Sequence, residues 1–401
     1  MSASSLSASP TSAPNRSLLL PTGFRCHVAN VGIKDTTTDF IVVAAESTCA
    51  AAGVFTQSRF AGPSVVVSRE HIAGHAARAV VVISKNANVA TGAEGLANAR
   101  EIVSGVADAL HCQVCEVLLA STGVIGRQYP MDNVRAGLGA LSWPFSGTNA
   151  LDVATGIMTT DTVAKTATAQ VAGSAAIVVG VAKGVGMIEP NMATLITLMF
   201  TDARVEPTDL GRIFGRVIDR TFNCVSIDTD TSTSDTAIVM ANGAAGDVDL
   251  DAFESALADV ALSLTKQVAR DGEGAEKLIE VRVDGGRDDA QAKRVAKAIV
   301  NSPLVKTAVH GADPNWGRVA MAIGKCSDDT DIDENKVVIR FGPHECYPAQ
   351  FEIGHLAALS AYLTNDEIVI HVSLGIADGA ATVWGCDLTE GYVHINADYT
   401  T

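Results

Sequence analysis

Short β-branched runs alternate with longer amphipathic segments along this 401-residue chain, and this alternation limits its fold more than any other feature. The run "ARAVVVISK" (77–85) has the composition of a strand, "GLANAREIVSGVADAL" suits a helix, and "CEVLLAS" returns to a strand. Between residues 249 and 269, apolar residues recur at three- and four-residue steps and form one helical face: Phe253, Leu257, Val260, Leu264 and Val268. The pattern predicts a layered α/β (α+β) protein in which helices cover sheets.

The last quarter of the chain is predicted to be rich in strands. This prediction rests on four β-branched runs: "KLIEVRVDG", "KVVIRF", "DEIVIHVSLG" and "ATVWGCDLTEGYVHIN". At the other end, residues 1–15 are small and polar, which predicts a disordered tail, with an organelle-targeting peptide as the alternative. No internal repeat or long linker follows the tail.

Charge and cysteine usage exclude several classes of partner. Lys+Arg 29 against Asp+Glu 45 gives a net charge of -16, which repels nucleic acid and anionic membranes. No apolar run reaches the roughly 18 residues needed to cross a bilayer. The eight cysteines lie mostly in apolar settings and are expected to be reduced, which favours a cytoplasmic protein. Small molecules or copies of the same chain are therefore the expected partners.

The familiar cofactor and metal motifs fail on their spacing. Asp329, Asp331 and Asp333 match the start of a calcium loop, but Glu334 replaces the turn glycine and Arg340 replaces the bidentate acid. The glycine pairs lack the third glycine of a dinucleotide fingerprint, and there is no phosphate-binding loop and no zinc-protease motif. We expect no cofactor and no metal.

The stretch "GMIEPNMATLITLMF" (186–200) places Thr194 where a polar loop enters an apolar strand. A threonine hydroxyl is a weak nucleophile unless a base lies beside it, and its own α-amino group can be that base once the preceding peptide bond is cut. Small Ala193 would leave the carbonyl of that bond accessible. The alternative is that Thr194 is simply a β-former that begins a strand.

The stretch "LLASTGVIGR" (118–127) offers donors for an oxyanion. A buried strand is predicted to end at Ser121, and Thr122 and Gly123 follow in a turn where a hydroxyl and a backbone N–H can point outward together. A simple strand-ending turn explains Gly123 almost as well.

Six stretches of the chain together resemble the ornithine acetyltransferase (ArgJ) family, and they occur in the family's order from about Arg25 onward. They are "STGVIG", "IMTTDT", "KGVGMIEPNMATL", "DGEGAEKLIEV", "HGADPNWGR" and "YVHINADYTT". "IGRQYPMD" and "GCDLTEGYV" are most similar to the paralogue encoded with clavulanic-acid biosynthesis. The resemblance implies a DmpA/ArgJ-like αββα sandwich with a strand-rich C-terminal portion.

The resemblance also implies a precursor that cuts itself between Ala193 and Thr194, giving an α chain (16–193 after the tail) and a β chain (194–401). Thr194 is then the nucleophile of a ping-pong glutamate N-acetyltransferase, which moves acetyl from N2-acetyl-L-ornithine to L-glutamate. The family needs no cofactor, and its two chains are expected to assemble as an α2β2 heterotetramer in the cytoplasm.

The resemblance assigns Thr122 and Gly123 to the oxyanion hole. The implied substrate contacts are Thr160, Lys183, Thr194, Glu273, Asn396 and Thr401. Lys183 can pair with the carboxylate of an amino-acid substrate, and Glu273 with its cationic amine.

Three questions stay open at this point. Some family members also acetylate glutamate from acetyl-CoA, and an aminopeptidase or amidohydrolase class shares the N-terminal nucleophile. The place of the enzyme, in the cyclic arginine pathway or in specialised metabolism, is the third.

Overall fold

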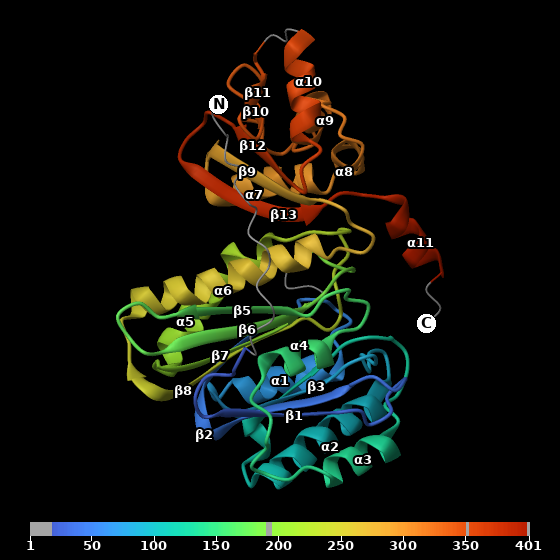
Figure 1. Cartoon of the computed structure of the whole chain (residues 1–401), viewed down its shortest axis with the longest axis vertical. Helices are drawn as coiled ribbons and strands as arrows, with labels where there is room; N and C mark the ends of the chain where they lie inside the picture. The colour runs from blue at the N-terminus through green and yellow to red at the C-terminus, as the bar shows by residue number, and fades with distance from the viewer. Residues whose placement is uncertain (1–17, 190–194, 350–352, 399–401) are drawn as a thin grey trace, which may run out of the picture.

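The computed structural model describes residues 18–189, 195–349 and 353–398 and arranges them in two sheets with helices packed against them (Figure 1). Within these residues, no helix is both long enough and apolar enough to span a membrane.

The larger sheet has the strand order β4-β3-β2-β8-β7-β6-β5, with β1 paired to β2. Its strands are β1 (Phe24–Ala29), β2 (Phe40–Phe55), β3 (Ala76–Ile83), β4 (Val117–Ser121), β5 (Lys165–Gln170), β6 (Ile177–Lys183), β7 (Ile196–Arg204) and β8 (Thr236–Asp247). The long strand β2 belongs to both halves: its first part pairs with β3, the register breaks between Ala44 and Cys49, and its last part pairs with β8. A break of this kind lets one strand bend between two layers.

The two halves of this sheet face each other across an apolar core. Ile41, Val80 and Leu118 come from one half, and Leu198 and Ile238 from the other. Helices α1 (Pro63–Ile72), α2 (Gly92–Leu110) and α3 (Met131–Gly139) lie outside the first half, while α5 (Pro207–Arg220) and α6 (Leu250–Arg270) lie outside the second; α4 (Ala150–Ile157) packs into the shared core. The αββα sandwich expected from the sequence is confirmed.

The smaller sheet belongs to the C-terminal portion and has the order β11-β10-β12-β9-β13. Its strands are β9 (Leu278–Gly286), β10 (Val338–Phe341), β11 (His344–Tyr347), β12 (Glu367–Ser373) and β13 (Gly379–Cys386). The helices of this portion are α7 (Asp289–Val300), α8 (Pro303–His310), α9 (Trp316–Gly324), α10 (Ile353–Tyr362) and α11 (Glu390–Asp398), and short 3₁₀ turns lie at Val114–Glu116 and Phe222–Cys224. Helix α6 lies between the two sheets (Figure 1).

Most predicted elements are present, and one is wrong in part. The runs predicted as a strand at 77–85 and as a helix at 249–269 form β3 and α6, and the five apolar residues named for that helix are all buried. The run "ATVWGCDLTEGYVHIN" is β13 only in its first half, because its second half is helix α11. Val393 and Ile395 are 63% and 40% exposed there, so no sheet buries the β-branched side chains that suggested a strand.

Candidate functional site

Six of the residues predicted from the sequence line one cavity of about 190 Å³: Thr122, Gly123, Thr160, Lys183, Glu273 and Asn396. They come from the end of β4, the loop after α4, the end of β6, the loop after α6, and α11. Ala193, Thr194 and Thr401 lie outside the described residues. The described chain resumes at Leu195, and Ile196 pairs with Lys183 in the β6–β7 ladder.

The turn after β4 is held by backbone hydrogen bonds to the segment after β3. The N–H of Thr122 donates to the carbonyl of Ile83 at 3.1 Å, and the N–H of Val124 donates to Lys85 at 3.3 Å. Gly123 has φ 127°, and a Cβ there would lie 2.2 Å from the carbonyl carbon of Lys85. Only glycine fits this conformation and this close approach. The turn therefore presents Thr122 and Gly123 to the cavity on a rigid support.

Lys183 carries a buried ammonium at the end of β6. Its Nζ donates to the hydroxyl of Thr122 at 3.2 Å and lies 4.0 Å from a carboxylate oxygen of Asp161. Burial lowers the pKa of Lys183, and the charge of Asp161 acts in the opposite direction. Because the Thr122 oxygen accepts from Lys183, the hydroxyl hydrogen of Thr122 can be donated to another acceptor.

A buried ionic network behind Lys183 was missed by the sequence analysis. Asp161 accepts from the N–H of Gly184 and from Lys165 Nζ, both at 2.7 Å, and Lys165 Nζ reaches Asp271 at 2.5 Å. Burial opposes ionisation of Asp161, but the ammoniums of Lys183 and Lys165 outweigh it and lower the pKa of that carboxyl. Asp161 and Asp271 stand inside the motifs "IMTTDT" and "DGEG", so their proximity in sequence to Thr160 and Glu273 was the available signal.

Glu273 lies half-buried on the other side of the cavity, where two side chains donate to its carboxylate. Thr160 Oγ1 donates at 3.4 Å and Asn396 Nδ2 at 2.9 Å, while the N–H of Glu273 donates to the carbonyl of Val185 at 2.8 Å. A Cβ at Gly186 would lie 2.6 Å from the Glu273 carboxylate, so a larger residue there would displace the carboxylate from its present position. The contacts orient the carboxylate toward the cavity that Lys183 also lines.

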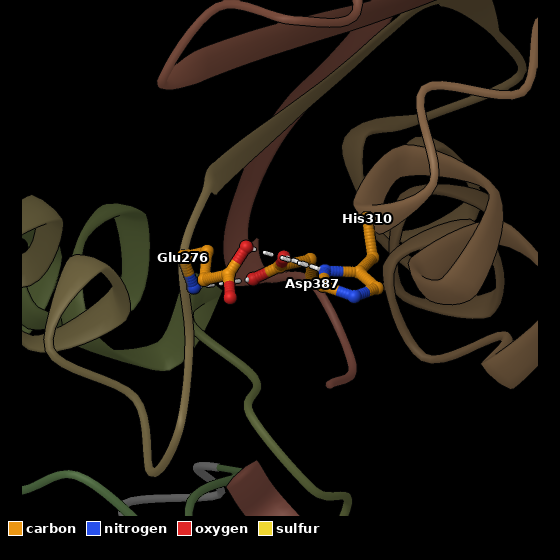
Figure 2. Close-up of side chains that lie close together, drawn as sticks. All are labelled: Glu276, His310 and Asp387. Atoms are coloured by element: carbon orange, nitrogen blue, oxygen red, sulfur yellow. Dashed lines mark hydrogen bonds and ion pairs between the residues drawn. The ribbon is translucent and has the colours of Figure 1, made fainter. Parts of the chain in front are cut away.

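The loop that carries Glu273 is held from the C-terminal portion by Asp387 (Figure 2). One oxygen of Asp387 accepts from the N–H groups of Glu276 and Lys277 at 2.9 Å and 3.0 Å, and the other lies 3.2 Å from His310 Nδ1. In the described part of the chain, Glu276, His310 and Asp387 are the one group of three with metal-ligand atoms within 4.8 Å of one another. Since Asp387 is buried and already accepts three contacts, the cluster serves as a hydrogen-bonded clamp on this loop.

A second cavity of about 560 Å³ adjoins the first and shares Gly123, Thr159 and Thr160 with it. Lys34, Asp35 and Lys85 also line it, and Lys85 Nζ forms an ion pair with Asp35 at 2.9 Å. The smaller cavity therefore lies next to a wider one that carries charged side chains.

The model of the ArgJ family matches residues 25–401. This chain belongs to the ArgJ family. Glutamate N-acetyltransferase Oat2 of Streptomyces clavuligerus is 60% identical over 388 residues, which cover 95% of this chain and 98% of that protein. Arginine biosynthesis bifunctional protein ArgJ 2 of Nostoc sp. is 55% identical over 381 residues, with 95% and 98% covered.

One solved ArgJ chain can be set beside this member of the family. The arginine biosynthesis bifunctional protein argJ of Bacillus halodurans is 41% identical and covers 49% of this chain and 96% of its own, with a TM-score of 0.47.

Proposed function

We propose that this ArgJ protein is a glutamate N-acetyltransferase that moves acetyl from N2-acetyl-L-ornithine to L-glutamate through an ester on Thr194. Its 60% identity to a protein named glutamate N-acetyltransferase supports the reaction class. One structural observation carries the proposal: the oxyanion pair, the buried ammonium of Lys183 and the carboxylate of Glu273 line one cavity, and Lys183 pairs with Ile196, two residues after Thr194.

Cleavage between Ala193 and Thr194 gives the nucleophile its own base. The new α-amino group of Thr194 accepts the Oγ1 proton as Oγ1 bonds to the acetyl carbon, and the same proton then passes to the ornithine nitrogen as the C–N bond breaks. The Thr122 hydroxyl and the Gly123 N–H donate to the oxyanion of the tetrahedral intermediate. Glutamate then attacks the ester through its amine, and the steps run in reverse. No step calls for a metal or a cofactor.

Strand pairing in the larger sheet would hold the two chains together after cleavage. Strand β6 would be the last strand of the α chain, and β7 would be the first strand of the β chain. The two strands pair antiparallel, from Val178–Thr201 to Lys183–Ile196. β8 and β2 extend the pairing across the same boundary. The cut chains (16–193 and 194–401) would therefore stay in one fold. We also propose that the cut protein assembles as an α2β2 heterotetramer and that it is located in the cytoplasm.

The charges of the cavity suit an amino-acid substrate. Lys183 can meet the substrate carboxylate, and Glu273, oriented by Thr160 and Asn396, can meet the side-chain ammonium of ornithine. Thr401, outside the described residues, is the remaining proposed contact, three residues beyond the end of α11.

Acetyl-CoA is the alternative acyl donor. The Nostoc relative is named a bifunctional protein, and a wider cavity that carries charged side chains adjoins the reaction cavity here. We therefore propose acetyl-CoA as a second acetyl donor, separate from the transfer from N2-acetyl-L-ornithine. Either donor fits a role in the cyclic arginine pathway or a paralogous role in specialised metabolism.

The deciding experiment incubates purified protein with N-acetylornithine, with and without glutamate, and measures ornithine and N-acetylglutamate. Ornithine release that requires glutamate supports the transferase, whereas release at the same rate without glutamate would identify a hydrolase of the aminopeptidase or amidohydrolase type. A parallel assay with acetyl-CoA and glutamate tests the second donor. A denaturing gel of the same active sample should show two bands, and a single intact band would rule out cleavage.

A further inference from the structure

The two proposed amino-acid substrates carry opposite charges on their side chains. Ornithine ends in an ammonium and glutamate in a carboxylate, yet both must bring their α-nitrogen to the same acyl carbon. Among the described residues that line the reaction cavity, the charged ones are Lys183 and Glu273. Glu273 suits the ornithine ammonium but repels a carboxylate, and Lys183 is proposed to bind the α-carboxylate that both substrates share. The side chain of glutamate therefore needs a cation outside this cavity.

The wider cavity of about 560 Å³ supplies cations next to the oxyanion turn. It shares Gly123 and Thr160 with the reaction cavity, so it lies against the backbone N–H that is proposed to donate to the oxyanion. Its charged lining residues, among those that the structure describes, are Lys34, Lys85 and Asp35, which place two ammoniums against one carboxylate. A lining with this balance of charge attracts an anionic group.

The backbone of Lys85 packs against the oxyanion turn. Its carbonyl accepts from the N–H of Val124 at 3.3 Å, and its carbonyl carbon would lie 2.2 Å from a Cβ at Gly123. The φ of Lys85 is 73°, in the left-handed region that glycine adopts more easily, so a lysine there costs conformational energy. A long cationic side chain at a position that favours glycine indicates a role for that side chain.

The ammonium of Lys85 is held by an acid that can give way to a substrate. Lys85 Nζ donates to Asp35 Oδ1 at 2.9 Å and to the hydroxyl of Thr37, and the Lys85 side chain is only 10% exposed. The Asp35 side chain is 48% exposed, so its carboxylate can stay hydrated when another carboxylate takes its place beside Lys85. The pair therefore keeps the ammonium in the cavity wall until an anion binds.

We propose that the wider cavity is the side-chain subsite of the acceptor, in which Lys85, together with Lys34, binds the side-chain carboxylate of L-glutamate. The proposal rests on the proposed function, because glutamate is the acceptor only if the protein is the transferase. The ornithine side chain extends to Glu273, and the glutamate side chain extends past Gly123 into the wider cavity. Because ornithine leaves before glutamate binds in a ping-pong reaction, the two side chains are never accommodated at once.

The test compares Lys85→Met with the unmodified full-length chain, with N-acetylornithine as donor and glutamate as acceptor. In a ping-pong reaction, kcat/KM for each substrate reports its own half-reaction. We expect kcat/KM for glutamate to fall by roughly 10-fold, the effect of losing one hydrogen bond to a charged group, and kcat/KM for N-acetylornithine to stay near the unmodified value. Lys85→Arg keeps the cation and should regain most of the glutamate value.

Lys293→Met is the matched control. Lys293 lies on α7, pairs with Asp219 at 3.0 Å with its side chain 24% exposed, and lines neither cavity. We expect it to leave kcat/KM for both substrates unchanged. An unchanged glutamate value in Lys85→Met, an equal fall for both substrates, or an equal loss in the methionine and arginine variants would each overturn the proposal.

Asp35→Asn decides the question if Lys85→Met does not fold. The amide oxygen can still accept from the N–H of Thr37, which now donates to Asp35 Oδ1 at 2.7 Å, while the competing anion is removed. A raised kcat/KM for glutamate supports the subsite, and an unchanged or lower value contradicts it. Failure of the proposed function is distinguishable, because it would appear in the unmodified protein as ornithine release that does not require glutamate.

Discussion

Lys183 Nζ lies 3.2 Å from Thr122 Oγ1, although the two residues are 61 positions apart and belong to the ends of β6 and β4. Lysine donates and cannot accept, so the threonine oxygen is the acceptor and its hydrogen can be donated into the cavity. This pairing ties the proposed oxyanion donor to the residue proposed to bind the substrate carboxylate. Under these proposed roles, substrate binding and transition-state stabilisation would be coupled through one contact.

Thr122→Ala should lower kcat for acetyl transfer by about 10²-fold, or on the order of 3 kcal/mol, because one of two oxyanion donors is lost. Autocleavage should slow for the same reason. Thr122→Ser keeps the hydroxyl and is expected to retain most of the rate. Steady-state kinetics of the three proteins, with densitometry of the cleavage bands, checks this. Equal loss in the alanine and serine variants would point to packing rather than hydrogen bonding.

Thr194→Ala should abolish both cleavage and transfer, since the proposed attacking oxygen is absent in both reactions. The measurement is a denaturing gel combined with intact mass and the ornithine assay. Thr197→Ala serves as a control: Thr197 is a buried threonine on β7 whose hydroxyl donates to the carbonyl of Val181 at 3.1 Å. That variant is expected to be cut. Two normal chains from the Thr194 variant would refute the assignment of the nucleophile.

Stability should depend on pH through Asp161. Its folded-state pKa is lowered, so the carboxylate adds stability above the unfolded-state pKa of about 3.9, and this contribution is lost as pH falls through the lower folded value. Asp161→Asn should therefore be less stable at pH 7, by roughly 3 kcal/mol for a broken buried pair, and the gap to wild type should narrow in acid. Urea unfolding at several pH values measures this gap. A constant gap across pH would show that the carboxylate charge contributes nothing.

Glu273→Gln should raise KM for N-acetylornithine by on the order of 10-fold or more, because the side-chain ammonium of ornithine loses its counter-charge. Asn396 and Thr160 donate to different oxygens of Glu273, so in the glutamine variant Asn396 can donate to the amide oxygen while the Thr160 hydroxyl accepts from the amide nitrogen, and the loop should keep its shape. KM for glutamate, which has no side-chain cation, should change less. Glu276→Gln is the matched control, since that side chain is 65% exposed on the same loop. Equal changes in both KM values would argue against a contact with ornithine.

The sequence predicted the layers and much of the cavity, for physical reasons that are visible in particular residues. The apolar period of 249–269 and the β-branched run at 77–85 report burial directly, and both elements are present. Thr122 and Lys183 were found because they stand in motifs. Asp161 and Lys165 were missed because a buried charge leaves no periodic signal, and its significance depends on a partner that only the fold supplies. The helix at 390–398 was missed because its β-branched residues suggested a strand. In the structure these side chains are exposed, and no sheet buries them.

A C-terminal extension tests the last proposed substrate contact. Asn396 donates to Glu273 from α11, and Thr401 follows five residues later in the sequence, so its hydroxyl is proposed to reach the same substrate. A six-histidine tag after Thr401 should raise KM for the acyl donor or lower kcat, whereas the same tag at the N-terminus should not. Removing the C-terminal tag by a carboxypeptidase should restore the kinetics. Full activity with the tag in place would remove Thr401 from the site while leaving Thr122, Lys183 and Glu273 as proposed.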